Sequence, residues 1–241
     1  SSRASKSMQW TRKGQGEGAV THGIVVFLGP SCDRSVAGRI VAADYRPPAA
    51  RGDITSAAAE GARIITLIDG VFFQECAVGH REIIAALSQG IRVIGASSMG
   101  ALRASELHTL GMEGVGLIYR LYRDGRLVSD DEVALVYDPE TYCALSEPLI
   151  NIRCTLREAR NAGIITGTEE RELLASARSL YFPERTYALV CRHAGEKIPG
   201  ETCQRFLEFA RSHAVDQKRE DAIAALRRTR EVALEAGILK E

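Results

Sequence analysis

The sequence lacks the features that identify several large functional classes of protein. No apolar run approaches the roughly 20 residues that a membrane-spanning helix needs, and the N-terminal residues contain no apolar segment of a secretory signal. Thirty-one basic residues balance 31 acidic ones, so no net charge would attract nucleic acid or an anionic membrane. We therefore expect a cytoplasmic protein that binds neither nucleic acid nor membranes.

Patterns for disulfides, metals and nucleotides are also scarce. The 6 cysteines include no CxxC pair, and the 5 histidines show no i,i+4 pairing. In a chain of 241 residues, such scattered cysteines are typical of reduced thiols or small buried side chains. Cys191 and His193 alone supply too few ligands for zinc. No glycine-rich phosphate-binding motif follows an expected strand, so we predict neither a metal nor a cofactor.

The composition changes near residue 22. Residues 1–22 are rich in Ser, Gly, Gln, Lys and Arg and show almost no apolar periodicity, which is typical of a flexible leader or a cloning remnant. No linker in the remaining chain is long enough to require a second domain. We expect residues 23–241 to form one α/β domain with a helical C-terminal part.

Apolar runs and helical patterns alternate in the first half of the chain. Continuous apolar runs predict buried strands at 24–28, 64–68 and 92–94, and helical patterns lie at 35–43, 54–60 and 81–87. This alternation indicates right-handed βαβ units and a mostly parallel sheet flanked by helices. Beyond Gly100 we expect a helical extension, interrupted by a strand at 133–137, with helices at 102–110, 116–122, 156–161, 169–180, 202–213 and 219–236.

The segment after the third strand is the richest in chemical groups. It reads Gly95-Ala-Ser-Ser-Met-Gly100 and leads directly into a helix. A strand, a turn and a helix in this order resemble a nucleophile elbow, which raises a hydroxyl at the sheet edge beside helix N-terminal amides. The spacing differs from the strict GxSxG motif. The alternative is that Ser97 and Ser98 only cap the helix, which is the commoner role of such serines.

A nucleophilic serine needs a base, and lysine is the most informative residue type to search. Lysine occurs only at Lys6, Lys13, Lys197, Lys218 and Lys240. Lys218 shares a helical face with Ala222 and Ala225, so burial and the positive helix end would both lower the pKa of its amine. The alternative is a lysine that stretches over apolar surface to reach water. His80 could also approach the same edge, or it could be held by local hydrogen bonds at a helix start.

Other polar residues are weaker candidates. Arg46 lies in a proline-rich turn at residues 44–48 and could anchor a carboxylate or a chain end. Asp69 follows a strand, where it could orient a base or accept hydrogen bonds from nearby amides. Arg103 and Glu106 have the i,i+3 spacing of an ordinary ion pair. Cys32, in the loop after the first strand, is a rival nucleophile without an evident base.

Several unusual strings occur together and in a fixed order. They are Phe27-Leu-Gly-Pro-Ser31, Asp44-Tyr-Arg-Pro-Pro-Ala49, Leu67-Ile-Asp-Gly-Val-Phe72, His80-Arg-Glu-Ile83, Gly95-Ala-Ser-Ser-Met-Gly-Ala-Leu-Arg-Ala104, Gly111-Met-Glu-Gly-Val-Gly116 and Asp216-Gln-Lys-Arg-Glu-Asp-Ala222. As a group they resemble the TfuA-like family, and the likeness runs from about Ile24 to Leu226.

The resemblance implies a partner of a YcaO-type ATP-dependent enzyme in peptide backbone thioamidation. Family members are understood to hydrolyse the C-terminal thiocarboxylate of a small ThiS-like sulfur-carrier protein through a serine and lysine pair. The serine carries over to Ser98, and we assign the lysine to Lys218. Position 81, where relatives frequently have lysine, is Arg81 here. From the residues themselves, we expect the amides of Met99 and Gly100 to hold the oxyanion, and Arg46, Asp69, His80 and Arg103 to bind the substrate.

Two functions remain open at this stage. The first is a hydrolase that liberates sulfide. The second is a non-catalytic docking and activation subunit that helps the YcaO enzyme bind its peptide, with Ser98 as a helix cap only. Both roles can coexist in one protein.

Overall fold

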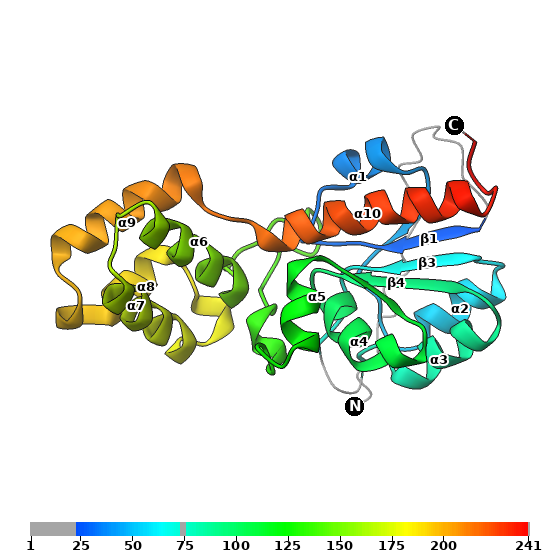
Figure 1. Ribbon diagram of the computed structural model, residues 1–241, viewed down its shortest axis with the longest axis horizontal. Helices are drawn as coiled ribbons and strands as arrows, with labels where there is room; N and C mark the ends of the chain where they lie inside the picture. Colours follow the sequence, from blue (N-terminus) through cyan, green and yellow to red (C-terminus); the bar gives the residue numbers. More distant parts are fainter. Residues whose placement is uncertain (1–22, 73–75, 241) are drawn as a thin grey trace, which may run out of the picture.

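The computed structural model describes residues 23–72 and 76–240, so the expected leader at residues 1–22 lies outside the described residues. Two lobes lie along the long axis of the molecule (Figure 1). One is an α/β body, and the other is a group of helices formed by α6 (Leu149–Asn161), α7 (Gly167–Ser179), α8 (Tyr187–Ala194) and α9 (Gly200–His213). Helix α10 (Gln217–Glu235) starts at the junction of the lobes and runs back along the α/β body.

The sheet of the α/β body is parallel throughout. Its strands are β1 (Ile24–Phe27), β2 (Asp44–Arg46), β3 (Ile64–Leu67), β4 (Arg92–Ala96) and β5 (Glu113–Val115), in the order β2-β1-β3-β4-β5. In register, Val25 of β1 lies beside Asp44 of β2 and Ile65 of β3. The prediction of a mostly parallel α/β sheet with a helical C-terminal part is confirmed.

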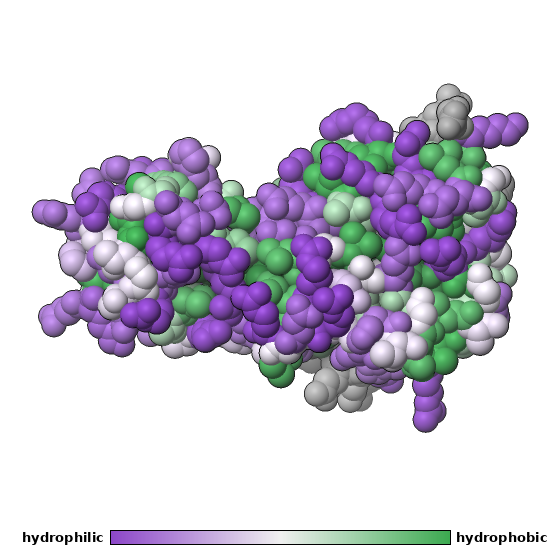
Figure 2. Space-filling model, in the orientation of Figure 1, coloured by the Kyte–Doolittle hydropathy of each residue, from purple (hydrophilic) through white to green (hydrophobic). Residues whose placement is uncertain are grey.

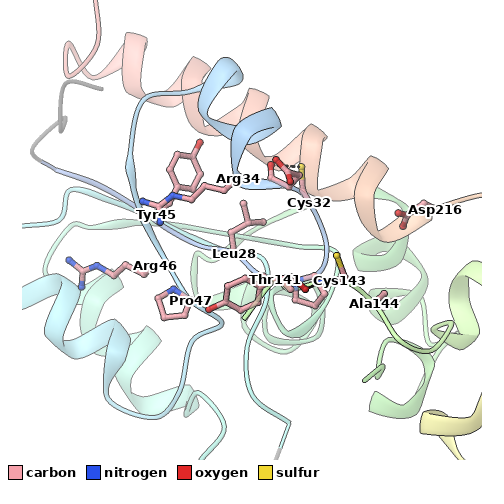
Figure 3. A pocket seen from close by; sticks show the side chains of 14 residues that line it. Leu28, Cys32, Arg34, Tyr45, Arg46, Pro47, Thr141, Cys143, Ala144 and Asp216 are labelled. Carbon is pink, nitrogen blue, oxygen red and sulfur yellow. Dashed lines mark hydrogen bonds between the residues drawn. The ribbon is translucent and has the colours of Figure 1, made fainter. Parts of the chain in front are cut away.

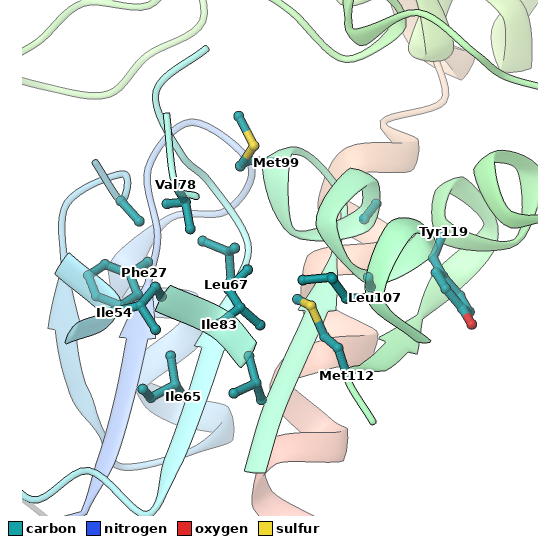
Figure 4. Close-up of a cluster of buried hydrophobic side chains, with 14 of the residues drawn as sticks. Phe27, Ile54, Ile65, Leu67, Val78, Ile83, Met99, Leu107, Met112 and Tyr119 are labelled. Carbon is teal, nitrogen blue, oxygen red and sulfur yellow. The ribbon is translucent and has the colours of Figure 1, made fainter. Parts of the chain in front are cut away.

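Helices cover both faces of this sheet. Helices α1 (Arg34–Ile40) and α10 lie on one face, and the other face carries α2 (Asp53–Ala59), α3 (His80–Ser88), α4 (Met99–Leu107) and α5 (Gly116–Arg123) (Figure 1). Successive side chains of a strand point to opposite faces. Accordingly, Ile24 and Val26 pack beneath α1 and α10, whereas Val25 and Phe27 join the core on the other face (Figure 4). Both faces being buried explains the continuous apolar runs of the sequence.

Helix α10 contacts the sheet through small residues and one polar pair. Ala222 and Ala225 are fully buried, which lets the helix approach β3 and β4 closely. Thr229 of α10 and Thr66 of β3 share a hydrogen bond of 2.6 Å between their hydroxyl oxygens. Because this contact fixes the helix against the sheet, the start of α10 is held at the carboxyl edge of the strands.

The helical lobe has a hydrophobic cluster of its own. Leu149 and Ile152 of α6 pack there with Leu173 of α7 and Phe206 of α9. Polar side chains cover much of the visible surface of this lobe, and the molecule narrows between the lobes (Figure 2). No helix within the described ranges combines the length and the apolar composition needed to cross a membrane.

Several elements differ from the sequence-based expectation. The strand predicted at 133–137 is wrong, because that segment makes only an isolated antiparallel bridge between Tyr137 and Ala144. Strand β2 lies in the segment interpreted as a turn, and β5 and α8 were not predicted. The two strands are three-residue elements at the edges of the sheet, too short for a periodic pattern to identify.

Candidate functional site

The carboxyl ends of β1, β3 and β4 meet where the strand order reverses. From β1 the chain passes to β2 on one side, whereas from β3 it passes to β4 on the other. Loops diverge at such a point and leave a crevice that commonly binds ligands in parallel α/β sheets. The segments gathered here are Gly29 to Asp33, Asp69 to Gly70 and Ser97 to Met99.

A chain of buried hydrogen bonds connects these three segments. The Ser97 hydroxyl donates to the Ser31 hydroxyl at 2.9 Å, and Ser31 donates to the Asp69 carboxylate at 2.6 Å. Asp69 also accepts the backbone N–H groups of Gly29 and Ser31. Ser97 has a φ of 65°, a left-handed conformation that is costly for a residue with a side chain. The network therefore holds Ser97 and the turn after β4 in a strained geometry.

The Ser98 side chain has a different environment. Ser98 occupies the N-cap position of α4, yet its side chain makes no capping hydrogen bond. It is only 2% exposed, and its hydroxyl has no hydrogen-bond partner in the described part of the chain. It lines a small cavity of about 30 Å³. The capping interpretation is therefore wrong, and the Ser98 hydroxyl is left unengaged beside the cavity.

Lys218 lines the same cavity from the start of α10. Its side chain is 2% exposed, and its amine donates to the backbone carbonyl of Val133 at 2.9 Å. No carboxylate of residues 23–72 or 76–240 forms an ion pair with it. Burial lowers the pKa of the Lys218 amine, and the charges of Asp69 and Asp216 oppose this shift. The alternative of a lysine that reaches bulk water is therefore wrong.

Side chains from two lobes hold Lys218 in place. The Asn151 side-chain oxygen on α6 accepts the Lys218 N–H at 3.2 Å, and its amide nitrogen donates to Asp216 at 3.0 Å. One turn further along α10, Asp221 accepts the N–H groups of Leu117 and Ile118 at the start of α5. Asn151 and Asp221 were not predicted as site residues, although each is a polar residue on an otherwise apolar helix face, which is a signal in the sequence.

Three glycines allow the close packing that raises Ser98 to the sheet edge. A Cβ atom on Gly100 would lie 1.7 Å from the Leu67 carbonyl oxygen, and one on Gly95 would lie 2.2 Å from the Gly100 oxygen. A Cβ on Gly70 would come within 2.9 Å of the Met99 Cβ. Because these positions carry hydrogen only, the first turn of α4 rests directly on the ends of β3 and β4.

The structure corrects the expected pair of oxyanion donors. The Gly100 N–H already donates to the Ile68 carbonyl at 3.2 Å. The Met99 N–H has no acceptor among the described residues. Gly70 lines the Ser98 cavity, and its N–H also lacks an acceptor there. The N–H of the next residue, Val71, donates to the Ala49 carbonyl. Successive N–H groups of an extended chain point to opposite sides, so the Gly70 N–H is directed away from Ala49. The N–H groups of Met99 and Gly70 are therefore unpaired among the described residues, and of these two residues Gly70 lines the Ser98 cavity.

Two of the expected substrate-binding residues lie together elsewhere. The Glu106 carboxylate contacts His80 at 2.7 Å and Arg103 at 2.8 Å, so the ion pair predicted between Arg103 and Glu106 is confirmed. His80 and Arg103 line a cavity of about 270 Å³ that does not include Ser98. Of the four expected substrate-binding residues, only Asp69 lies at the Ser98 cavity.

Arg46 lines a third cavity, of about 430 Å³, on the β2 side of the sheet (Figure 3). Its guanidinium pairs with Asp44 at 2.8 Å and with Glu60 at 2.6 Å. Cys32 lines the same cavity, and burial raises the pKa of its thiol. A raised pKa disfavours the thiolate, so Cys32 is poorly suited to act as a nucleophile.

Comparison with protein families gives a match over part of the chain. Residues 69–186 match the family described as TfuA-like protein. The matched segment covers nearly half of the chain and includes Asp69 and Ser98, but it ends before Lys218 and begins after Ser31. The search of curated proteins gave no match to the chain.

Proposed function

Residues 69–186 belong to the TfuA-like family, which is linked to YcaO-associated thioamidation, and from this premise we propose that the protein hydrolyses the thiocarboxylate of a sulfur carrier. The carrier is a small ThiS-like protein with a C-terminal thiocarboxylate. The sulfide released supplies a YcaO-type enzyme that thioamidates the backbone of its peptide substrate. Ser98 is the proposed nucleophile, and Lys218 is the proposed base.

The observation that carries this proposal is the shared cavity of Ser98 and Lys218. The serine comes from the turn after β4, and the lysine comes from a helix more than a hundred residues later. A serine hydroxyl with no partner and a buried amine with a lowered pKa are the two groups that a serine and lysine pair requires. Asp69 at the same cavity supplies a fixed negative charge that stabilises the lysinium form after proton transfer.

The first chemical step forms an ester on Ser98. Neutral Lys218 takes the hydroxyl proton while the serine oxygen bonds to the thiocarboxylate carbon. Negative charge develops on the carbonyl oxygen, where the N–H groups of Met99 and Gly70 can stabilise it by about 3 kcal/mol for each donor. The carbon–sulfur bond then breaks, and the protonated Lys218 amine gives its proton to the departing sulfur, which leaves as hydrosulfide. In the second step, water attacks the ester while neutral Lys218 takes one of its protons and passes it to the departing Ser98 oxygen. The carrier then leaves with a carboxylate end, and the remaining acid proton is released to solvent.

Measurement of sulfide release from a thiocarboxylated carrier tests this assignment. Ser98→Ala and Lys218→Met should each abolish enzyme-dependent release. Ser105→Ala is the matched control, because Ser105 lies on the same helix and its hydroxyl only donates to the Leu102 carbonyl. Turnover by Ser98→Ala equal to that of the wild type would refute the hydrolase.

A docking and activation subunit is the second candidate function. The cavity volume of about 30 Å³ favours it, because a space of this size holds little more than a water molecule and must widen before a chain end can enter. In this role the protein helps the YcaO enzyme engage its peptide. With free sulfide supplied, both functions predict normal thioamidation by Ser98→Ala, so this variant does not distinguish them. Omission of the whole protein does. If thioamidation is lost although sulfide is present, the protein has a docking role, and if thioamidation continues, the protein only supplies sulfide.

A further inference from the structure

A cavity of about 260 Å³ lies between the two lobes and adjoins the Ser98 cavity. We call it the interlobe cavity. Its walls come from the loop after β1, the segment before α6, helix α8 and the start of α10, and the residues that matter here are Pro30, Leu135, Glu147, Tyr187, Asp216 and Lys218. Pro30, Leu135 and Lys218 line both cavities. Lys218 therefore stands at the boundary between them.

Three other cavities have a weaker connection to Ser98. The cavity beside β2 shares only Pro30 with the Ser98 cavity, and the one lined by His80 and Arg103 shares only Phe72. A cavity of about 530 Å³ beside Arg81 shares no residue with it. Lys218 lines none of the three. A group that reaches Ser98 past its proposed base therefore arrives from the interlobe side.

Glu147 provides a carboxyl group, unpaired among the described residues, in the wall of the interlobe cavity. Its backbone N–H donates to the Arg185 carbonyl at 2.8 Å, which fixes the residue at the wall. Its half-buried carboxylate forms no hydrogen bond or ion pair with residues 23–72 or 76–240. Burial raises the pKa of the Glu147 carboxyl, and the neighbouring charge of Asp216 raises it further. A cation placed between these two carboxylates would relieve their repulsion.

The volumes of the two cavities suit a chain end that enters from the interlobe side. The Ser98 cavity is only about 30 Å³ in volume, so it must widen to take even the terminal atoms. The interlobe cavity, at about 260 Å³, is close in size to the smallest small-molecule sites, which begin near about 300 Å³. It can therefore hold a short extended stretch of chain but no folded domain. Prolines, Leu135 and Tyr187 supply its apolar contacts.

We propose that the interlobe cavity binds the extended C-terminal tail of the acyl donor, and that Glu147 pairs with a basic side chain upstream of the reactive carbonyl. This inference rests on the proposed hydrolase function. The tail passes Pro30 and Leu135, reaches Lys218 and presents its terminal carbonyl to Ser98. Glu147 selects the tail but takes no part in the reaction.

Two tryptophan substitutions test the route. Ala214→Trp fills the interlobe cavity from an exposed position, and Cys143→Trp fills the cavity beside β2 in the same way. Two substrates are compared. One is a five-residue peptide thioacid whose last residue is glycine, and the other is thioacetic acid, which has no peptide chain. Ala214→Trp should raise KM for the peptide about tenfold and leave thioacetic acid turnover unchanged, whereas Cys143→Trp should change neither. The opposite pattern would overturn the route.

A charge exchange tests the role of Glu147. The wild type should hydrolyse a peptide thioacid that carries lysine at a fixed upstream position with about tenfold higher kcat/KM than the same peptide with glutamate there. Glu147→Lys should reverse this preference. Glu184→Lys, on the helical lobe outside the cavity, is the matched control.

These outcomes separate the inference from the proposed function. Release that still depends on Ser98, with a preference unaffected by Glu147→Lys, rejects the tail site and retains the hydrolase. Release that does not depend on Ser98 rejects the hydrolase and, with it, the tail site.

Discussion

The side-chain amine of Lys218 donates to the backbone carbonyl of Val133 at 2.9 Å, and no ion pair with the described residues accompanies this contact. A lysine buried in this way costs stability, because its charged form loses the solvation of water. Groups in clefts whose pKa is shifted by burial and by a nearby charge are candidates for a functional role. The pair therefore argues for a chemical role of the amine over a structural one.

Lys218→Met should separate activity from stability. Methionine keeps most of the side-chain volume and removes the cost of a buried amine, while the Val133 carbonyl loses one hydrogen bond. We expect the free energy of unfolding to change by no more than about 1 kcal/mol, and sulfide release to fall at least about 100-fold. Urea denaturation and a sulfide assay measure the two effects. A variant that fails to fold would contradict the functional interpretation of the burial.

The same variant gives a pH test. The pKa of Lys218 is lowered from its ordinary value of 10.5, so between the folded-state pKa and 10.5 the unfolded chain binds more protons than the folded one. The free energy of unfolding of the wild type should therefore rise relative to Lys218→Met as the pH increases toward about 10. Denaturation curves at several pH values measure the difference. A difference that falls with pH would mean that the lysine pKa is raised instead.

Asp69→Asn should shift the pH profile of hydrolysis. The negative charge of Asp69 raises the pKa of Lys218, so a neutral asparagine should lower that pKa further. Because the base must be neutral, the acidic limb of the kcat/KM profile should move to lower pH. Asp33→Asn is the control, since Asp33 caps α1 through the Ser35 N–H and asparagine caps equally well. Movement of the limb to higher pH would exclude Lys218 as the base.

Ser97→Ala and Ser98→Ala should differ in stability. The Ser97 hydroxyl donates to Ser31 within a buried network, so its removal should cost about 1 kcal/mol. The Ser98 hydroxyl has no partner in the described chain, so its removal should cost less than about 0.5 kcal/mol. Chemical denaturation measures both values. Equal losses would indicate that Ser98 makes a structural hydrogen bond after all.

Gly100→Ala should prevent or severely weaken folding. A Cβ there would lie 1.7 Å from the Leu67 carbonyl oxygen, and neither backbone can move without displacing α4 from the sheet. We expect a loss of more than about 4 kcal/mol. Gly38→Ala is the matched control, because no atom lies within 4 Å of its Cβ position and alanine favours the helix by about 1 kcal/mol. Thermal unfolding of both variants measures the contrast.

The central strands were predictable because both of their faces are buried, which produces continuous apolar runs such as 24–28 and 64–68. Edge strands gave no such signal. Residues 44–46 contain the charged side chains of Asp44 and Arg46, and these pair with each other at the rim of the sheet. At residues 133–137 an apolar pattern predicted a strand where none forms. The apolar residues of this segment line the Ser98 cavity instead of joining the sheet.

Individual site residues could be predicted from the sequence only where their local pattern was distinctive. The turn after β4 and the buried face of α10 indicated Ser98 and Lys218 separately, and both line one cavity. Arg46, His80 and Arg103 were chosen because of their type, and each lies with carboxylate partners away from that cavity. Glu147 was not chosen, because its lack of a partner is a property of the folded chain.

The sequence by itself determined the parallel sheet, the helix after Ser98 and the apolar face of α10, because periodicity and local chain geometry are encoded in neighbouring residues. Only the tertiary structure decided that Lys218, Ser98 and Asp69 line one cavity, and that the Gly100 N–H donates to the Ile68 carbonyl. These contacts join segments far apart in the chain. They depend on how α10 crosses the sheet and on how closely the glycines let α4 approach it, which no local pattern specifies.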